Sequence, residues 1–317
     1  MLDIKYIVEN TDTVKNSLAK KGFAPENVDN LISSYLKMNK LKTSSQALAE
    51  EKNRLSNSIK TASAEERPAI IAKSREVGEE LKKEQDELNE IQAEFDDMML
   101  RMPNYPSPDC PVGPDESGNK VLRKVGEPRK FDFTPRDHIE LMELNDWSEM
   151  DRITKVCGSR TYAIKNDLAQ LELAIHMMVL DKLRSYGFSV ITVPALSKEK
   201  PLYGQGYLPF SRDEIYYMPA DDMYLSGTAE LILNSLRADE IIPENELPIL
   251  YAGFSPCFRR EAGAAGKDTR GLVRVHQFMK TEQFVICKND IAESDKWHKK
   301  LLAISEEVLQ DLELPYQ

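Results

Sequence analysis

The sequence has few cysteines and histidines, and both are scattered. Four histidines are present, and no C-x-x-C pair occurs among the four cysteines, Cys110, Cys157, Cys257 and Cys287. Zinc sites and disulfide frameworks need closely spaced ligands or paired cysteines, so both are disfavoured. We therefore expect no metal site built from protein side chains alone.

Long apolar runs and a basic excess are also absent. The chain has no run of about 18 apolar residues, and residues 1–4 lack the blocks of a secretion signal. We expect a cytoplasmic protein without a membrane partner. The net charge of −11 argues against indiscriminate nucleic-acid binding, because a polyanion is repelled at long range. A local basic face can still bind RNA.

What the sequence does contain is a heptad pattern in two successive segments. Apolar residues recur at three-four spacing from Leu31 to Ile59, and again from Ile70 to Met98. Two helices of matched length, each about 45 Å long, would pack as an antiparallel hairpin arm over about residues 30–100. Residues 1–7 resemble a short strand and residues 12–21 a helix, and both are expected at the base of the arm.

Charge is unevenly shared between the two predicted helices. Acidic residues dominate the second helix, whereas the first carries the basic residues Lys37, Lys40, Lys42, Lys52, Arg54 and Lys60. A wet helical hairpin needs many charges whatever its function, so a solvated surface explains the pattern. A basic face lying along an RNA backbone explains it too. Both interpretations stay open at this point.

The pattern changes to mixed helix and strand after a proline-rich linker at residues 103–108. Helices are predicted at 167–185 and 291–312, and short strands at 188–193, 216–218, 223–225 and 249–252. Strands outnumber the crossover helices that a parallel sheet would need, so we predict an antiparallel sheet flanked by helices. The fold class is α+β, with an N-terminal domain at 1–105 and a second domain at 106–317.

The most informative segment is 257–284, which reads as two strands joined by a glycine-punctuated basic loop. Residues 263–266 cannot pack a core and offer free backbone N–H groups, beside the positive charges of Lys267, Arg270 and Arg274. This chemistry suits phosphates.

Charged and aromatic side chains alternate along the two strands. Alternate residues of a strand share a face, so Arg259 should point with Glu261, and His276 with Phe278, with Glu282 further along. A guanidinium binds phosphate, a phenyl ring covers a purine, and carboxylates bind ammonium groups. The set suits ATP plus an amino acid. A charged hairpin on an enzyme's rim is the alternative, which the density of the segment disfavours.

These residues resemble a known family, the bacterial-type seryl-tRNA synthetases of class II, over the whole chain. The resemblance consists of the helical hairpin, Gly158-Ser-Arg160 with its following helix, residues 187–194 as the first class II motif, Ser226-Gly-Thr-Ala-Glu230, and residues 258–284 as the second motif. It implies a ligase of protein biosynthesis that activates L-serine with ATP to seryl-adenylate. The seryl group then passes to the 3′ end of tRNA-Ser.

The resemblance also assigns expected sites. Thr228, Ala229 and Glu230 would line the serine pocket, and Glu282 would bind serine. The expected ATP-binding residues are Arg259, Arg260, Glu261, Val275, His276, Gln277 and Phe278. Of these, Arg259 would hold the α-phosphate and be catalytic together with Glu261, and Phe278 would lie against adenine, while His276 would contact ATP through its backbone.

Further partners follow from the same resemblance. Mg²⁺ would be held by ATP phosphates and a carboxylate. The loop 263–271 would meet the tRNA acceptor end, the coiled-coil hairpin would hold the long variable arm, and the first motif would build a homodimer.

The chain departs from the family pattern in one respect. The third class II motif, whose arginine would bind the γ-phosphate, lies in the family beyond residue 317, as does the threonine that senses the serine hydroxyl. We therefore expect a truncated chain that does not by itself support full-rate aminoacylation. Two alternatives remain: another class II synthetase, which the hairpin disfavours, and an inactive synthetase-like module that binds tRNA or regulates.

Overall fold

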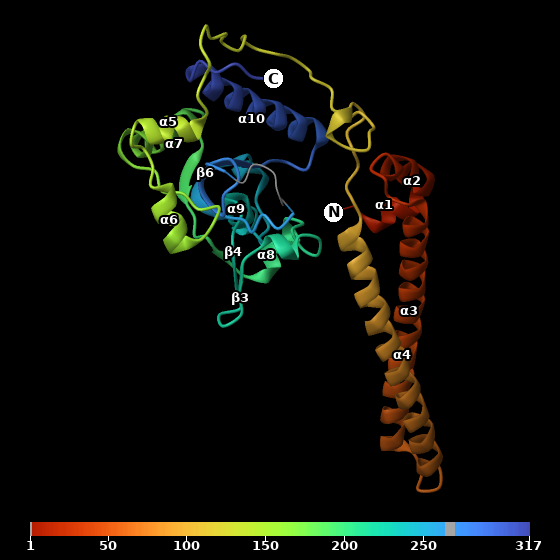
Figure 1. The fold of residues 1–317 in the computed structure, drawn as a ribbon. Helices are drawn as coiled ribbons and strands as arrows, with labels where there is room; N and C mark the ends of the chain where they lie inside the picture. The colour runs from red at the N-terminus through yellow and green to blue at the C-terminus, as the bar shows by residue number, and fades with distance from the viewer. Residues whose placement is uncertain (1, 264–269) are drawn as a thin grey trace. The chain divides into compact units, whose positions relative to one another are not determined.

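The computed structural model describes residues 2–263 and 270–317, which form two compact units, Met1–Lys120 and Val121–Gln317 (Figure 1). Each has a hydrophobic core of its own. In the described residues, the helices are all too short or too polar to cross a membrane.

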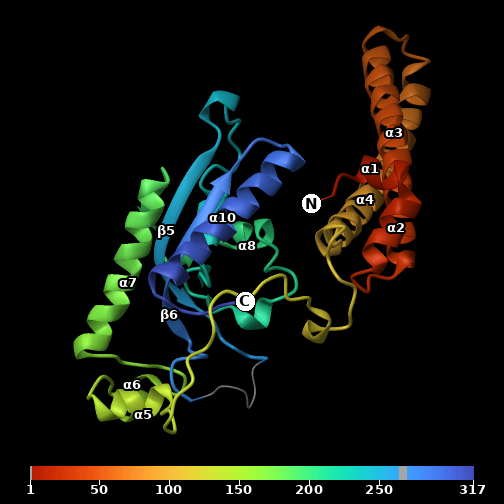
Figure 2. The same cartoon turned by 90° about the horizontal axis from the view of Figure 1, so that it is seen from above.

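The first unit is built around an antiparallel pair of long helices. Its helices are α1 (Ile4–Glu9), α2 (Thr11–Ala19), α3 (Pro25–Thr61) and α4 (Arg67–Arg101). Helices α3 and α4 lie side by side along their length, which confirms the predicted hairpin (Figures 1 and 2). At 37 and 35 residues they are each about 55 Å long, longer than predicted.

Heptad positions supply the seam between α3 and α4. Met38, Val77, Ile91 and Phe95 are buried there. Ser45 is a polar member of the seam, only 6% exposed, and its hydroxyl donates a hydrogen bond of 3.3 Å to the Glu84 carboxylate. The neighbouring Ser44 hydroxyl donates to the same carboxylate at 2.6 Å.

The predicted strand at residues 1–7 is wrong. The Asp3 side chain caps α1 by accepting a hydrogen bond from the Lys5 N–H, and Ile4 and Ile7, three residues apart, turn toward the core at the base of the hairpin. A spacing of three places side chains on one face of a helix but on opposite faces of a strand. Packing against Val14 and Leu18 therefore selects the helix.

Within its described residues, the second unit contains two three-stranded sheets. The larger has the order β1-β5-β6, with β1 (Ser189–Thr192), β5 (Ile249–Phe258) and β6 (Gln277–Ile286). The smaller has the order β2-β4-β3, with β2 (Leu196–Ser197), β3 (Tyr217–Met218) and β4 (Met223–Leu225). The predicted α+β fold is confirmed. The long pair β5 and β6 is antiparallel, whereas β1 runs parallel to β5.

Helices cover both faces of the larger sheet. The helices of this unit are α5 (His138–Leu144), α6 (Met150–Cys157), α7 (Asn166–Ser185), α8 (Glu199–Gly204), α9 (Ala229–Ser235) and α10 (Ile291–Asp311), with 3₁₀ turns at Arg212–Glu214 and Glu244–Glu246. A further 3₁₀ turn, Glu116–Gly118, belongs to the first unit. Helices α7 and α10 meet one face around Ala252, and α9 packs on the other around Tyr251. Adjacent residues of β5 thus face opposite cores.

Glycine at position 253 lets α9 approach the sheet closely. A Cβ there would lie 2.8 Å from Leu233 Cδ1 and 2.9 Å from Ala229 Cβ, closer than packed carbon atoms come. Because Ala229 opens α9 and Thr228 caps it, this contact sets how near Thr228 lies to β6.

Candidate active site

The candidate site lies on the face of β6 that looks toward α9. Side chains alternate along β6, so Phe278, Lys280 and Glu282 share this face, while Thr281 and Gln283 turn to α7 and α10. Thr281 contacts His176 on α7, and Gln283 donates a hydrogen bond to a carbonyl of α10. The polar residues of one strand are thus divided between the site and the structural core.

Three side chains form a closed triangle of hydrogen bonds at the start of α9. The Thr228 hydroxyl donates to Glu282 Oε2 at 2.7 Å and accepts from Lys280 Nζ at 2.6 Å. Lys280 Nζ also lies 2.5 Å from Glu282 Oε2. Thr228 is held in place because its hydroxyl additionally accepts from the Glu230 N–H at 3.2 Å and so caps α9. The structure thus joins Thr228 and Glu282, two residues expected to bind serine.

Arg259 and Phe278 form a second cluster at the adjoining end of the sheet. The Arg259 guanidinium carbon lies 5.3 Å from the centroid of the Phe278 ring, a cation–π distance. Arg259 follows the last residue of β5, and its N–H donates to the His276 carbonyl at 3.0 Å. The exposed arginine side chain can leave the ring without disturbing a core.

The prediction that Arg259 and Glu261 share a strand face is wrong, because β5 ends at Phe258. The backbone turns at Glu261, whose φ of 53° is left-handed and incompatible with a strand. Its carbonyl accepts a hydrogen bond from Arg160 at 3.0 Å, and its carboxylate accepts one from Arg274 at 3.3 Å. Glu261 is thus oriented by tertiary contacts.

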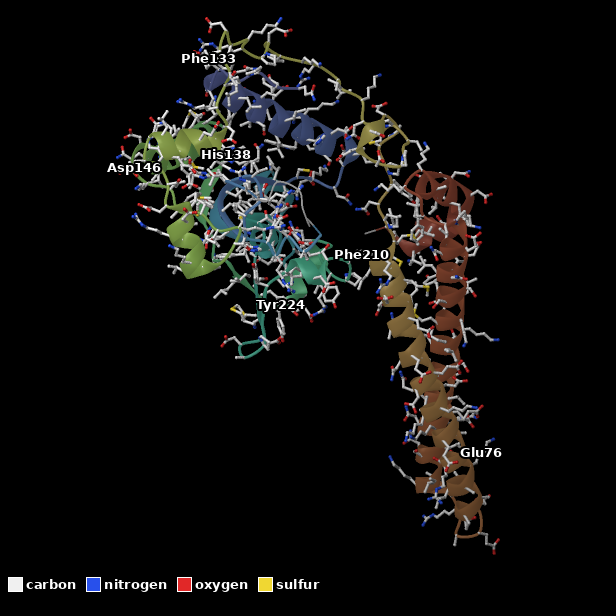
Figure 3. The ribbon with its side chains drawn as sticks, viewed as in Figure 1. Glu76, Phe133, His138, Asp146, Phe210 and Tyr224 are labelled. Atoms are coloured by element: carbon white, nitrogen blue, oxygen red, sulfur yellow. The ribbon has the colours of Figure 1, made fainter. Side chains whose placement is uncertain are left out.

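Glu214 and His138 anchor the two ends of the basic loop. The Glu214 carboxylate accepts hydrogen bonds from the N–H groups of Ala262 at 3.1 Å and Gly263 at 3.0 Å. At the other end, His138 Nε2 on α5 accepts from the Leu272 N–H at 3.2 Å (Figure 3). The loop predicted to meet the acceptor end, 263–271, lies outside the described residues at 264–269.

A cavity of about 570 Å³ opens beside the loop ends. It is lined by Leu202, Tyr207, Ser211, Glu214, Ile215, Leu225, Gly227, Phe258, Arg259, Glu261, Gly263 and Arg274. Burial raises the pKa of Tyr207, which lines the cavity with a phenol group that can donate or accept a hydrogen bond. With both charges of Arg259 and Glu261 in its wall, the cavity suits a polar, charged ligand more than an apolar one.

The other expected site residues differ in how far their side chains are exposed. Ala229 and Val275 are buried, so their side chains contribute to packing, and Glu230 is half-buried at the first turn of α9. Arg260 is exposed, and its N–H donates to the Glu214 carbonyl at 3.0 Å. Gln277 is exposed at the start of β6.

His276 is held by hydrogen bonds from its backbone and its ring. Its N–H donates to the Arg160 carbonyl at 2.9 Å, and its carbonyl accepts from Arg259. Its Nδ1 lies 3.0 Å from the Arg259 carbonyl oxygen. These contacts place His276 in the scaffold that positions Arg259.

Sequence reasoning missed Lys280, Glu214 and Tyr207. Lys280 carried a usable signal, since it stands midway between Phe278 and Glu282 in the same alternation. Glu214 and Tyr207 gave no such signal in the sequence. Each is distant along the chain from the 257–284 segment, and only the fold brings it there.

Comparison with known proteins identifies the family. The seryl-tRNA synthetase N-terminal domain matches residues 1–106, and the tRNA synthetase class II core domain (G, H, P, S and T) matches residues 216–317. The chain is 42% identical to the serine–tRNA ligase of Deinococcus radiodurans and 40% identical to that of Corynebacterium glutamicum. It aligns along all of its own length and 74% of each relative.

Solved structures agree. Seryl-tRNA synthetase from Pyrococcus horikoshii complexed with ATP superposes with a TM-score of 0.89 at 34% identity, over 100% of this chain and 76% of the other. The cytoplasmic serine–tRNA ligase of Naegleria fowleri in complex with AMP gives 0.85 at 25% identity, over 100% and 77%. The chain belongs to the seryl-tRNA synthetase family.

Proposed function

We propose that the protein joins L-serine to tRNA-Ser in two steps on the α9 face of β6. The serine carboxylate first attacks the α-phosphorus of ATP, and pyrophosphate leaves. The 3′-terminal ribose hydroxyl of the tRNA then attacks the seryl carbonyl, and AMP leaves. The observation that carries the proposal is the Thr228–Glu282 pair on the same sheet face as Arg259 and Phe278, in a chain of this family.

Serine would be held through its ammonium group by Glu282 and the Thr228 hydroxyl. Glu282 supplies the negative charge, and the hydroxyl supplies an acceptor fixed by its capping bond to α9. Glu230, on the first turn of α9, would complete the pocket, and Ala229 would set its depth through its close contact with Gly253.

ATP would use the cluster at the adjoining end of the sheet. Adenine would stack on Phe278, and Arg259 would move from that ring to the α-phosphate, where its charge is needed as negative charge spreads in the transition state. Glu261 would contact ATP from the turn, and Arg260, Val275, His276 and Gln277 would frame the nucleotide, His276 through its hold on Arg259. Catalysis on this view is positioning and neutralisation, with no side chain acting as nucleophile.

Mg²⁺ would enter as the counter-ion of the ATP phosphates. In the described residues, no group of three or more His, Cys, Asp or Glu side chains is arranged to hold a metal ion. Glu214 and Glu261 both lie in the cavity wall. Because the Glu214 carboxylate already accepts from the N–H groups of Ala262 and Gly263, Glu261 would be the carboxylate that faces such an ion. The ion would add neutralising charge to that of Arg259.

The two parts of the chain would divide the work. Residues 1–105 would form the tRNA-binding domain, with the hairpin against the long variable arm, and residues 106–317 the catalytic domain. The loop 263–271 would meet the acceptor end. Residues 187–194 would contribute to a homodimer interface. The protein would act in the cytoplasm, where it would supply translation.

Serine-dependent exchange of pyrophosphate into ATP tests the proposal. We expect exchange that depends on serine, with threonine and alanine as controls, and we expect the serine-dependent exchange to be lost in Thr228→Val. A wild-type protein that binds tRNA-Ser yet neither exchanges pyrophosphate nor binds serine would favour the inactive tRNA-binding module. No observation on the described residues favours that alternative, since Arg259, Phe278, Thr228 and Glu282 are all in place.

A further inference from the structure

Lys280 binds the two groups that the proposed function assigns to serine. Its ammonium nitrogen lies 2.6 Å from Thr228 Oγ1 and 2.5 Å from Glu282 Oε2. The Lys280 and Glu282 side chains are 28% and 21% exposed, so the contact lies at the border between protein and solvent. A cation therefore already occupies the site where a substrate cation would bind.

The Thr228 hydroxyl has no remaining capacity for a second ammonium group. A hydroxyl has one donor and two acceptor lone pairs. Its proton goes to Glu282, and its lone pairs accept from Lys280 and from the Glu230 N–H. An amino acid that binds Thr228 through its ammonium group must therefore displace Lys280.

A lysine side chain is suited to such a displacement. Its ammonium group matches that of an amino acid in charge and in number of donors, and its four-carbon stem is flexible. Glu282 is mostly buried, and a buried carboxylate without a cation is unfavourable. The lysine removes that penalty while the amino acid is absent.

We propose that Lys280 is a tethered occupant of the amino-acid site. It fills the Thr228–Glu282 position while serine is absent, keeps both groups in binding geometry, and swings toward solvent when the ammonium group of serine takes its place. The proposal rests on the proposed function of Thr228 and Glu282. Its consequence is that the lysine weakens the binding of every amino acid at this site by the same factor.

Steady-state exchange kinetics of Lys280→Met test the proposal. If the lysine fills the site for about nine-tenths of the time, its removal lowers the KM for serine about tenfold, with the KM for ATP unchanged. The ratio of serine to alanine affinity should stay the same, because both amino acids meet the same competitor. Lys296→Met removes an equal charge from the exposed surface of α10 and should leave the KM for serine unchanged.

Serine binding measured by calorimetry without ATP supplies a second readout. Lys280→Gln keeps a hydrogen-bond donor but loses the charge, so its serine Kd should fall between those of the wild type and Lys280→Met. Thermal melting of both variants checks that they are folded. If Lys280→Met binds serine as weakly as the wild type or more weakly, Lys280 is a structural or substrate-contacting residue and the proposal is rejected.

The two proposals fail in different ways. A wild-type protein without serine binding and without exchange overturns the proposed function, and the Lys280 proposal falls with it. A wild-type protein that binds serine, with variants that do not bind it more tightly, overturns the Lys280 proposal alone.

Discussion

The hairpin and the candidate site differ in how their residues find their partners. In the hairpin, buried positions repeat along each helix, so the periodicity of one helix states which residues meet the other. In the site, Thr228 meets Glu282 across 54 residues of chain, and Arg160 meets Glu261 across 101. Local pattern specifies the first kind of contact, whereas only the complete fold specifies the second.

The largest expected effect comes from a substitution in the candidate site that should impair catalysis and leave tRNA binding by the hairpin intact. Arg259→Ala should reduce serine-dependent pyrophosphate exchange about 100- to 1,000-fold, because it removes the cation that faces the developing phosphate charge. The affinity for tRNA-Ser, measured by filter binding, should change little. An Arg259→Ala protein with near-normal exchange would contradict the assignment.

Substitutions on the exposed surface of α3 should have the opposite effect, impairing tRNA binding and leaving exchange intact. Lys40→Glu with Lys42→Glu should weaken tRNA-Ser binding about tenfold or more, and should reduce its dependence on salt, since phosphate contacts release counterions. Exchange measured without tRNA reports on the second unit alone. Unchanged tRNA affinity would leave the basic residues of the hairpin as a solvated surface.

Gly253→Ala should destabilise the second unit. The added methyl would lie within 2.9 Å of Ala229 Cβ and Leu233 Cδ1, and such overpacking costs about 1–3 kcal/mol. Displacement of α9 should also raise the KM for serine. Chemical denaturation measures the stability, and Gly204→Ala is the control, since its Cβ would meet only Asn234 Nδ2 at 3.9 Å. Equal stability of the two variants would contradict this account of the close contact.

Gly78→Ala should act in the opposite direction on the hairpin. Gly78 lies inside α4, and a Cβ there would contact only the end of Lys52 at 3.5 Å. Alanine is favoured over glycine in a helix by about 0.8–1.0 kcal/mol, so helical melting followed by circular dichroism should shift upward. A matched Gly22→Ala, at a residue with φ of 73°, should lower stability. A downward shift in Gly78→Ala would mean that Lys52 cannot move aside.

The smallest effect concerns pH and belongs to the second unit. His176 on α7 hydrogen-bonds Thr281 Oγ1 at 2.9 Å and packs on Phe254, and burial lowers its pKa below the ordinary 6.5. The unfolded chain then binds a proton at a higher pH than the folded one, so the free energy of unfolding falls as the pH drops below 6.5.

Urea denaturation measured about one pH unit above and below 6.5 tests this linkage. His176→Asn should flatten the pH dependence of the urea midpoint, whereas His298→Asn, at an exposed residue of α10, should not. Equal pH dependence in the wild type and His176→Asn would contradict it.

Much of the fold could be predicted from local pattern. The hairpin follows from its heptads, and α7, β1, β4 and α10 follow from apolar periodicity and terminating residues. The prediction of a strand at residues 1–7 failed because their apolar side chains also suit a strand. Only the core that they form with α2 and α3 selects a helix. The predicted strand through Glu261 failed for a related reason. Arg160 and Glu214, from distant segments of the chain, hold the backbone there in a turn.

The sequence predicted which residues form the candidate site but not which of them contact one another. Thr228, Arg259, Phe278 and Glu282 were identified by motif, and the structure brings them together in two pairs. Lys280 shows what motifs omit. A residue that completes a hydrogen-bond triangle is conspicuous only when the distances among its three members are known.

The two serine hydroxyls that meet Glu84 limit how the hairpin can change in length. Removing one heptad from α3 alone would shift the two helices by about 10 Å, and Glu84 would then face seam positions without those hydroxyls. A deletion that removes a whole heptad from each helix beyond the contact would keep the pairing. The hairpin should therefore tolerate deletions or insertions only in steps of seven residues made in both helices, because only such steps keep Ser44 and Ser45 opposite Glu84.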